Sequence, residues 1–405
     1  MSEQYFRRLS QSLSNAGIYT PTMLIDKERL DNNLEQLKCS IPEQVAFRIV
    51  AKSLPSIPFL QYVMEKTGSK RLMSFHIPFL MQLIKAFPDS DILLGKPMPI
   101  AAVKRFYHWA SQHAGRFDTG LQLQWLVDTP ERLTQYQALS DELNIPMRIN
   151  LEIDVGLHRG GFLADEKFSQ CIHQIKQSKQ LSLAGIMGYE AHISKLPLLL
   201  GGGFFALKAS KSSYQHFVKL LQDNLGHEAT QALCLNTGGS STYSLYGKTG
   251  VGYANEIATA SALVKPTDFD VGSLASHLPA AFIATPVLKR VTPLIPGFPF
   301  LSRLFKTLGI LPKQGCYLYG GNWLATPCYP AKMKKSTVFG HSSNQEFYQL
   351  PDDCNIHVDD FVFFRPAQSE ATLLQFGKLA IYEQGRITDW WSVLDYPSEF
   401  YNEIL

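Results

Sequence analysis

Short apolar runs alternate with amphipathic helical stretches from about residue 45 to residue 264, and this alternation constrains the fold most. Near-continuous apolar strands that alternate with helices form parallel sheets covered on both faces, so the pattern predicts an α/β fold. Eight such units match a (β/α)8 TIM-type barrel in number and size. The predicted strands are 45–52, 71–75, 91–95, 123–127, 147–155, 181–189, 232–237 and 257–264.

A doubly wound open sheet is the competing fold. It would carry a GxGxxG turn after its first strand and a single switch point where polar residues gather. The first predicted strand ends in AKSLP instead, and polar residues follow many of the strands. The barrel is therefore the better prediction.

The pattern changes beyond about residue 268, where helical periodicity fades and aromatic and β-branched residues dominate. The segments 354–366 and 378–394 read as strands, the second folded about Gln384-Gly385. Residues 269–405 therefore predict a second, β-rich domain. Within it, 285–313 is apolar, interrupted by prolines and basic, without an acidic residue. Two interpretations stay open: a cover or subunit contact, or a contact with a membrane surface or an apolar substrate.

Composition excludes several classes of protein. The 405-residue chain has a formal net charge of +3, which is too small for a nucleic-acid-binding surface. Its six cysteines are scattered without a CxxC pair, which suits a reducing cytoplasm better than a disulfide framework. No secretory signal or clean spanning run is evident, so a cytoplasmic protein without a membrane span is expected.

Polar residues follow several predicted strands at the edge where barrel enzymes carry their chemistry. Lys52 ends the first strand, and an amine there can act as a nucleophile or simply extend its stem to the surface. NTGGSSTY (236–243) follows the seventh strand, where glycines and serines can expose N–H groups to an anion or form a plain turn. Together, an amine and a phosphate loop fit pyridoxal phosphate, with its aldehyde and its phosphate.

Three further residues near the C-terminal ends of the predicted strands have two interpretations each. Tyr189 is a core aromatic or a proton-transfer and cofactor-packing group, and His192 is a surface histidine or a proton-transfer group. Arg159 either pairs with Glu152 or Asp154 or contacts the cofactor. A hinged apolar lid is the prediction for GGGFF (201–205).

Six segments together resemble the fold-type III pyridoxal-phosphate enzymes, in particular the alanine racemase-like group of D-threonine aldolases and D-serine dehydratases. These segments are TPTMLIDKERLDNN (20–33), RIVAKS (48–53), EIDVGLHRGGF (152–162), GIMGYEAH (185–192), NTGGSSTY (236–243) and NEIATAS (255–261). The resemblance implies a barrel over 22–268 and a β-rich domain made of 269–405 and residues 1–21. It also implies a homodimer acting on a small-molecule amino-acid substrate.

The resemblance implies a role for each matched residue. Lys52 would form the Schiff base, and Lys52, Tyr189 and His192 would be catalytic. The expected cofactor-binding residues are Lys52, Arg159, Tyr189, Thr237, Gly238, Gly239, Ser240 and Ser261. The match at Ser261 is imperfect, because alanines flank it where the family has glycine and tyrosine.

The tail departs from the family. Aldolases and dehydratases of the group carry a His-x-Cys or His-x-Asp metal pair, and Gln368 and Glu370 stand at these positions. Their oxygen ligands suit Mg²⁺ or Mn²⁺ better than zinc, if a metal binds at all. Without a metal, His192 or Glu370 would have to activate the substrate hydroxyl.

The leading functional prediction is a lyase that cleaves or dehydrates a D-β-hydroxy amino acid. The alternatives are an amino-acid racemase or epimerase, a non-catalytic pyridoxal-phosphate-binding protein, and a barrel whose glycine loop binds a substrate phosphate.

Overall fold

The computed structural model describes residues 1–196, 202–336, 338–397 and 400. The chain forms two compact units, each made of several segments. The barrel unit comprises Leu34–Ala262, Val271–Ser276 and Leu394–Leu405, and the sheet unit comprises Met1–Asn33, Leu263–Asp270 and His277–Val393. No helix in the described ranges combines the length and apolarity that crossing a membrane would need.

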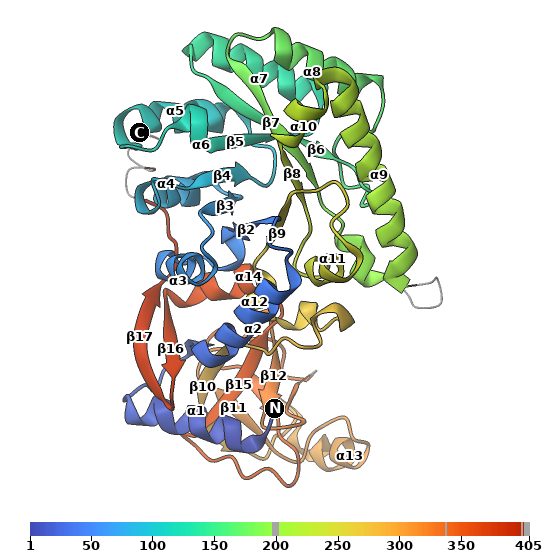
Figure 1. Ribbon diagram of the computed structural model, residues 1–405. Coiled ribbons are helices and arrows are strands. Elements are labelled where there is room, and N and C mark those ends of the chain that lie inside the picture. Colours follow the sequence, from blue (N-terminus) through green and yellow to red (C-terminus); the bar gives the residue numbers. More distant parts are fainter. Residues whose placement is uncertain (197–201, 337, 398–399, 401–405) are drawn as a thin grey trace. The chain divides into compact units, whose positions relative to one another are not determined.

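The barrel unit contains a closed barrel of eight parallel strands, which confirms the predicted fold class. Its strands are β2 (Ala46–Val50), β3 (Arg71–Ser74), β4 (Asp91–Leu94), β5 (Leu123–Val127), β6 (Met147–Ile153), β7 (Leu181–Gly188), β8 (Cys234–Thr237) and β9 (Glu256–Thr259). Helices lie outside these strands (Figure 1); the longer ones are α3 (Ile57–Thr67), α4 (Ile77–Ala86), α5 (Ile100–His113), α7 (Pro130–Leu143), α8 (Glu166–Gln177) and α9 (Gly202–Leu225). Shorter ones are α6 (Thr119–Gln122), α10 (His227–Gln231) and α11 (Tyr243–Thr249).

All eight predicted strands exist, but six of them end one to five residues earlier than predicted, and two of these ends bear on the site. The predicted strand 257–264 stops at Thr259, and Ser261–Val264 form the short helix α12. An apolar run of this length does not distinguish strand from helix, which explains the error. The predicted strand 45–52 stops at Val50, so Lys52 lies in the following 3-10 turn, Ala51–Ser53.

Inward-facing side chains fill the barrel in layers. Toward the N-terminal ends of the strands, the buried Arg48 guanidinium lies 2.6 Å from carboxylate oxygens of both Glu256 and Asp91. The next layer is apolar and consists of Met73, Leu93, Leu126, Met187 and Ala258, with Val50 and Phe75 packed against it. The mouth of the barrel, where the strands end, begins beyond this layer.

The sheet unit is built on a nine-stranded, mostly antiparallel sheet. N-terminal β1 (Thr22–Asp26) joins it between β10 (Ala281–Val291) and β16 (Lys378–Glu383). The other strands are β11 (Gly315–Leu318), β12 (Ala325–Tyr329), β13 (Lys334–Lys335), β14 (Phe347–Gln349), β15 (Phe361–Pro366) and β17 (Arg386–Ser392). Strands β16 and β17 form the hairpin predicted about Gln384-Gly385. The short helices are α13 (Ser302–Thr307) and α14 (Ser369–Leu373), and α2 (Lys27–Ser40) runs from this unit into the barrel unit.

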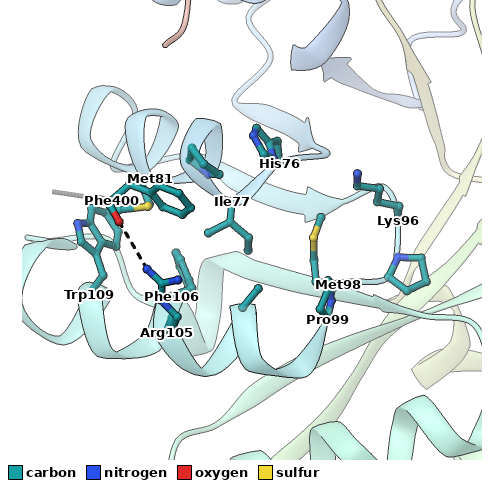
Figure 2. A pocket seen from close by; sticks show the side chains of 13 residues that line it. His76, Ile77, Met81, Lys96, Met98, Pro99, Arg105, Phe106, Trp109 and Phe400 are labelled. Atoms are coloured by element: carbon teal, nitrogen blue, oxygen red, sulfur yellow. Dashed lines mark hydrogen bonds between the residues drawn. The ribbon is translucent and has the colours of Figure 1, made fainter. Parts of the chain in front are cut away.

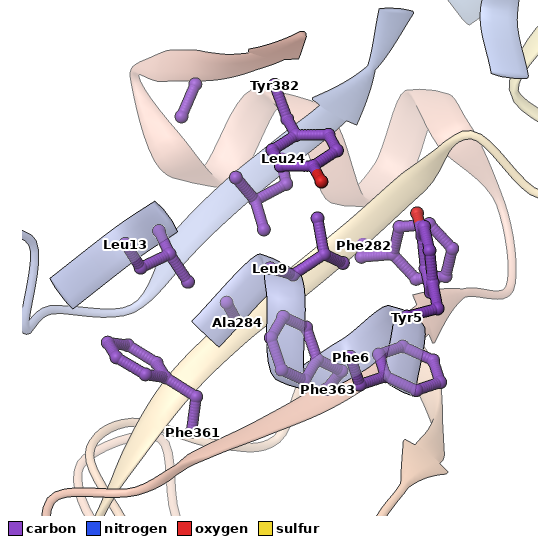
Figure 3. Close-up of a cluster of buried hydrophobic side chains, with 11 residues drawn as sticks. Tyr5, Phe6, Leu9, Leu13, Leu24, Phe282, Ala284, Phe361, Phe363 and Tyr382 are labelled. Atoms are coloured by element: carbon purple, nitrogen blue, oxygen red, sulfur yellow. The ribbon is translucent and has the colours of Figure 1, made fainter. Parts of the chain in front are cut away.

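Helix α1 (Glu3–Asn15) belongs to the sheet unit because one of its faces is apolar. Tyr5, Phe6, Leu9 and Leu13 recur at helical spacing and are buried. Figure 3 shows them packed against side chains of β1, β10, β15 and β16. This cluster ties the N-terminal helix to the C-terminal part of the chain within one core.

Candidate functional site

Lys52 lies at the mouth of the barrel, directly after β2. Its half-buried amine is 4.5 Å from the centre of the Phe75 ring, which packs against the apolar layer below. The neighbouring Ser53 hydroxyl is 2.8 Å from the Ser261 hydroxyl, in the segment that follows β9. Lys52 therefore lies on a turn that is held to the start of α12.

The loop after β8 carries the predicted anion-binding glycines. Gly238 has φ +91°, a backbone conformation that other residues rarely adopt. A Cβ atom on Gly239 would lie 2.7 Å from Cε2 of Tyr189, so only glycine lets the loop approach this ring. The Ser240 hydroxyl is 2.8 Å from the Thr259 hydroxyl of β9.

The backbone of this loop has donors available for an anion. Within the described residues, the N–H groups of Gly239, Ser240 and Ser241 have no hydrogen-bond partner. Both serines are only 8% exposed. Buried donors without partners cost free energy, and a phosphate group would satisfy them. The loop therefore fits the anion cradle that the sequence predicts.

Arg159 and Tyr189 lie together. The guanidinium carbon of Arg159 is 5.3 Å from the centre of the Tyr189 ring, within the range of a cation–π contact. The Arg159 guanidinium also lies 3.6 Å from a Glu152 carboxylate oxygen, one of the two pairings considered for it. Asp154 instead accepts hydrogen bonds from the backbone N–H groups of Gly156 and His158.

These contacts connect most of the predicted site residues into one group. The Lys52 turn meets Ser261 through Ser53, the Gly238–Ser240 loop meets β9 through Thr259, and Tyr189 bridges Gly239 and Arg159. An amine, an anion cradle, an aromatic ring and a guanidinium thus line the same mouth.

His192 lies in a 3-10 turn after β7, against the turn at Gly156. A Cβ atom on Gly156 would be 3.3 Å from Nε2 of His192, and Nδ1 is buried without a partner in the described part of the chain. Burial and the nearby His158 lower the pKa of His192, so the neutral imidazole is favoured near neutral pH. No described contact links His192 directly to Lys52.

Glu190 is a site residue to which the sequence assigned no role. Its fully buried carboxyl group accepts hydrogen bonds from the Thr242 hydroxyl (2.7 Å), the Thr237 hydroxyl (3.3 Å) and the Gly238 N–H (3.4 Å). Glu190 therefore anchors both ends of the Gly238–Ser240 loop. Thr237, predicted to contact a cofactor, uses its hydroxyl in this cluster.

The proposed metal positions lie in the sheet unit. The Gln368 side-chain amide donates a hydrogen bond of 3.0 Å to an Asp268 carboxylate oxygen, and Gln368 is the residue that precedes α14. Among the described residues, no group of three or more His, Cys, Asp or Glu side chains is placed to hold a metal ion. Metal binding by Gln368 and Glu370 stays a prediction.

Two other features of the barrel unit are the predicted lid and an apolar groove. Of the predicted lid, Gly201 is outside the described residues, and Gly202–Phe205 form the first turn of α9. A groove of about 300 Å³ lies between α4 and α5. Figure 2 shows the side chains that line it, with Phe400 at one side. It is lined mainly by apolar side chains, including Met81, Phe106 and Trp109, and by none of the predicted site residues.

Comparison with known proteins agrees with this geometry. Residues 25–251, more than half of the chain, match the family described as alanine racemase, N-terminal domain. The chain belongs to this family. No curated relative matches it by sequence.

Solved structures of related proteins share the fold of both units. The D-threonine aldolase from Filomicrobium marinum has a TM-score of 0.71 and 14% identity, over 93% of this chain and 95% of that chain. The D-threo-3-hydroxyaspartate dehydratase from Delftia sp. HT23 has a TM-score of 0.69 and 14% identity, over 93% and 97%. The alanine racemase of Clostridium difficile 630 in complex with cycloserine has a TM-score of 0.63 and 12% identity, over 91% and 97%.

At these identities the structural matches establish the fold. Together with the family match, they confirm the predicted resemblance to the alanine racemase-like, fold-type III group. Membership in this enzyme family supports a catalytic role for the chain.

Proposed function

We propose that the protein is a pyridoxal-phosphate-dependent lyase that acts on a D-β-hydroxy amino acid, by retro-aldol cleavage or dehydration. The observation that carries the proposal is the mouth of the barrel, where the Lys52 turn and the Gly238–Ser240 loop are both tied by hydroxyl pairs to the end of β9 and the residues after it. An amine for an aldehyde and buried N–H donors for a phosphate fit this cofactor. When bound, the cofactor withdraws electrons from the substrate Cα atom and weakens its bonds.

Each residue has a defined task in this proposal. Lys52 holds the aldehyde, and the N–H groups of Gly239 and Ser240 hold the phosphate. The Tyr189 ring, fixed between Gly239 and the Arg159 guanidinium, packs beside the cofactor and presents its hydroxyl for proton transfer. His192, whose lowered pKa favours the neutral form, accepts a proton from the substrate hydroxyl.

The choice of a lyase follows the activities of the aldolase and the dehydratase that share the fold. A racemase is the second candidate, because Gln368 and Glu370 replace the metal pair that assists β-hydroxyl chemistry and a racemase needs Cα proton transfer alone. A homodimer in the cytoplasm is part of the proposal, and light scattering and cell fractionation would test these two points.

The purified protein tests the cofactor part of the proposal. We expect added pyridoxal phosphate to produce a visible absorbance band, and borohydride to fix the cofactor on a peptide that contains Lys52. Lys52→Ala should lose both signals and keep its circular dichroism spectrum. A protein that folds but shows no band and no labelled peptide would contradict the proposal.

A panel of D-amino acids tests the reaction. D-threonine and D-serine should release an aldehyde or a keto acid, and exchange of the Cα proton with deuterated solvent in the absence of either product would identify a racemase. Repeating the panel with a chelator and with added Mg²⁺ or Mn²⁺ tests the metal prediction at Gln368 and Glu370, because only metal-assisted turnover responds.

A further inference from the structure

The segment 285–313 presents large apolar side chains to solvent around α13, which Figure 1 shows in the sheet unit. We call this set the α13 patch; its members are Leu294, Phe298, Phe300, Leu304, Leu308 and Ile310. Phe300 is 75% exposed, and its ring packs edge-on against that of Phe298, with the ring centres 6.2 Å apart. Exposed apolar side chains that are scattered singly are ordinary, whereas a group in one segment marks an interaction surface.

An ordered scaffold holds the α13 patch outward. Ser302 is buried and its hydroxyl accepts a hydrogen bond of 2.9 Å from the Ile295 N–H. Leu311 is 1% exposed, and its N–H donates to the Phe305 carbonyl group. The segment is therefore anchored at several points, and the exposure of its apolar side chains follows from a folded arrangement.

The charged residues within the segment 285–313 all have the same sign. Residues 285–313 contain no Asp or Glu and five basic residues. Arg303, Lys306 and Lys313 line a shallow hollow of about 440 Å³ together with Leu294 and Phe300. Lys313 pairs with Asp352, whereas Arg303 and Lys306 form no ion pair with any described residue.

We propose that the α13 patch binds the surface of an anionic lipid bilayer, a property that does not depend on the proposed enzymatic function. The exposed apolar and aromatic side chains would insert into the hydrocarbon region of the bilayer. The neighbouring unpaired basic side chains would contact the negatively charged headgroups. Helix α13 has six residues, so it lies in the surface and does not span it. A second copy of the chain fits less well, because a twofold contact of this patch with itself would bring cations against cations.

Vesicle co-sedimentation tests the proposal with the full-length protein. We expect binding to vesicles of phosphatidylcholine and phosphatidylglycerol, weaker binding as salt rises, and little binding to phosphatidylcholine alone. Arg303→Gln with Lys306→Gln should weaken binding ~30-fold, because each cation near an anionic leaflet contributes about a fivefold gain. Phe298→Ser with Phe300→Ser should weaken it by at least ~10-fold through lost apolar burial.

Matched variants on the barrel unit are the controls. Lys208→Gln with Lys219→Gln makes the same charge change on α9, and Leu121→Ser with Leu163→Ser removes two exposed leucines elsewhere. Both should bind vesicles as the parent protein does. The proposal is overturned if the parent does not prefer anionic vesicles, or if the controls weaken binding as much as the patch variants. It is also overturned if the parent is a dimer that does not bind vesicles and the variant with Phe298→Ser and Phe300→Ser is a monomer.

Discussion

Two glutamates at opposite ends of the barrel are both fully buried, yet their surroundings differ. Glu256 begins β9, and its carboxylate oxygens lie 2.6 Å from Arg48 and 2.7 Å from Arg71. Glu190 follows β7, and its carboxyl group accepts hydrogen bonds from the Thr237 and Thr242 hydroxyls and the Gly238 N–H. One residue is surrounded by guanidinium groups and the other by neutral donors.

The different partners give the two carboxyl groups opposite charge preferences. Burial opposes ionisation of both. At Glu256 the charges of Arg48 and Arg71 and their hydrogen bonds outweigh burial and lower the pKa. At Glu190 burial prevails over the bonds from Thr242 and Tyr246, so its pKa is raised.

This difference separates the structural end of the barrel from its chemical end. At the Glu256 end, the carboxylates and guanidinium groups compensate one another. At the mouth, the raised pKa of Glu190 favours its neutral form. Glu190 can then anchor the Gly238–Ser240 loop without placing a negative charge near a bound phosphate. We therefore expect changes at Glu256 to affect folding and changes at the mouth to affect cofactor binding.

Glu256→Ala should have the largest effect. It removes a carboxylate that pairs with the 0% exposed Arg48 side chain and leaves Asp91 alone to balance it, and breaking a buried ion pair in this way costs about 3–5 kcal/mol. We expect this loss in the free energy of unfolding, measured by urea denaturation. Lys104→Ala, which breaks the exposed pair with Glu142, is the control and should cost less than about 1 kcal/mol. Equal losses for the two variants would refute the structural role of the Glu256 end.

Gly239→Ala should act on binding more than on folding. The new Cβ atom would lie 2.7 Å from the Tyr189 ring, so the ring or the loop must move. A clash of this kind costs about 1–3 kcal/mol, which corresponds to a loss of ~5- to 150-fold in affinity for pyridoxal phosphate if the loop moves. Absorbance titration measures this affinity.

Gly272→Ala provides the matched control for Gly239→Ala. It lies in the barrel unit, has no atom within 4 Å of an added Cβ and has an ordinary φ, so its affinity should not change. Unchanged affinity in both variants would mean that the loop does not hold the cofactor.

The loss of stability at acidic pH should depend on the carboxylates at the N-terminal end of the barrel, Glu256 and Asp91. The pKa values of Glu256 and Asp91 are lowered against burial by their guanidinium partners, so the unfolded chain binds protons more readily than the folded one. Their stabilisation is complete above the unfolded pKa of about 4 and is lost as pH falls through the lower folded values. Urea midpoints measured from pH 7 down to pH 3 should fall in the parent protein and less steeply in Glu256→Gln. Parallel profiles would contradict this assignment.

The sequence was sufficient for the barrel because each strand is an apolar run between turn signals, and such signals are local. The sequence also predicted that Lys52, Tyr189 and Gly239 lie at the same end of the barrel, because each follows the C-terminal end of a parallel strand. The contact between Gly239 and the Tyr189 ring agrees with that placement.

Pairing across the barrel could not be predicted in the same way. The two carboxylate partners of Arg48 lie 43 and 208 positions away along the chain. Nothing local marks Asp91 or Glu256 as those partners. Glu190 was visible as a carboxylate after an apolar strand, yet its role depends on Thr242, which reaches it only once the loop after β8 folds back. Long-range side-chain pairing, rather than strand placement, is what the sequence left undetermined.

The smallest expected effect is also the sharpest test of the comparison. Because the folded pKa of Glu190 is raised, the folded state binds its proton more readily, and this residue lowers stability as pH rises above its unfolded pKa of about 4.3. Glu190→Gln keeps the hydrogen-bond acceptor without the charge. At neutral pH its free energy of unfolding should therefore equal that of the parent or exceed it by less than about 1 kcal/mol. Glu190→Ala, which leaves the Thr242 and Gly238 donors unsatisfied, should be less stable by about 1–3 kcal/mol and bind pyridoxal phosphate more weakly. If glutamine is as harmful as alanine, Glu190 acts as a carboxylate, and the two ends of the barrel follow the same electrostatic rule.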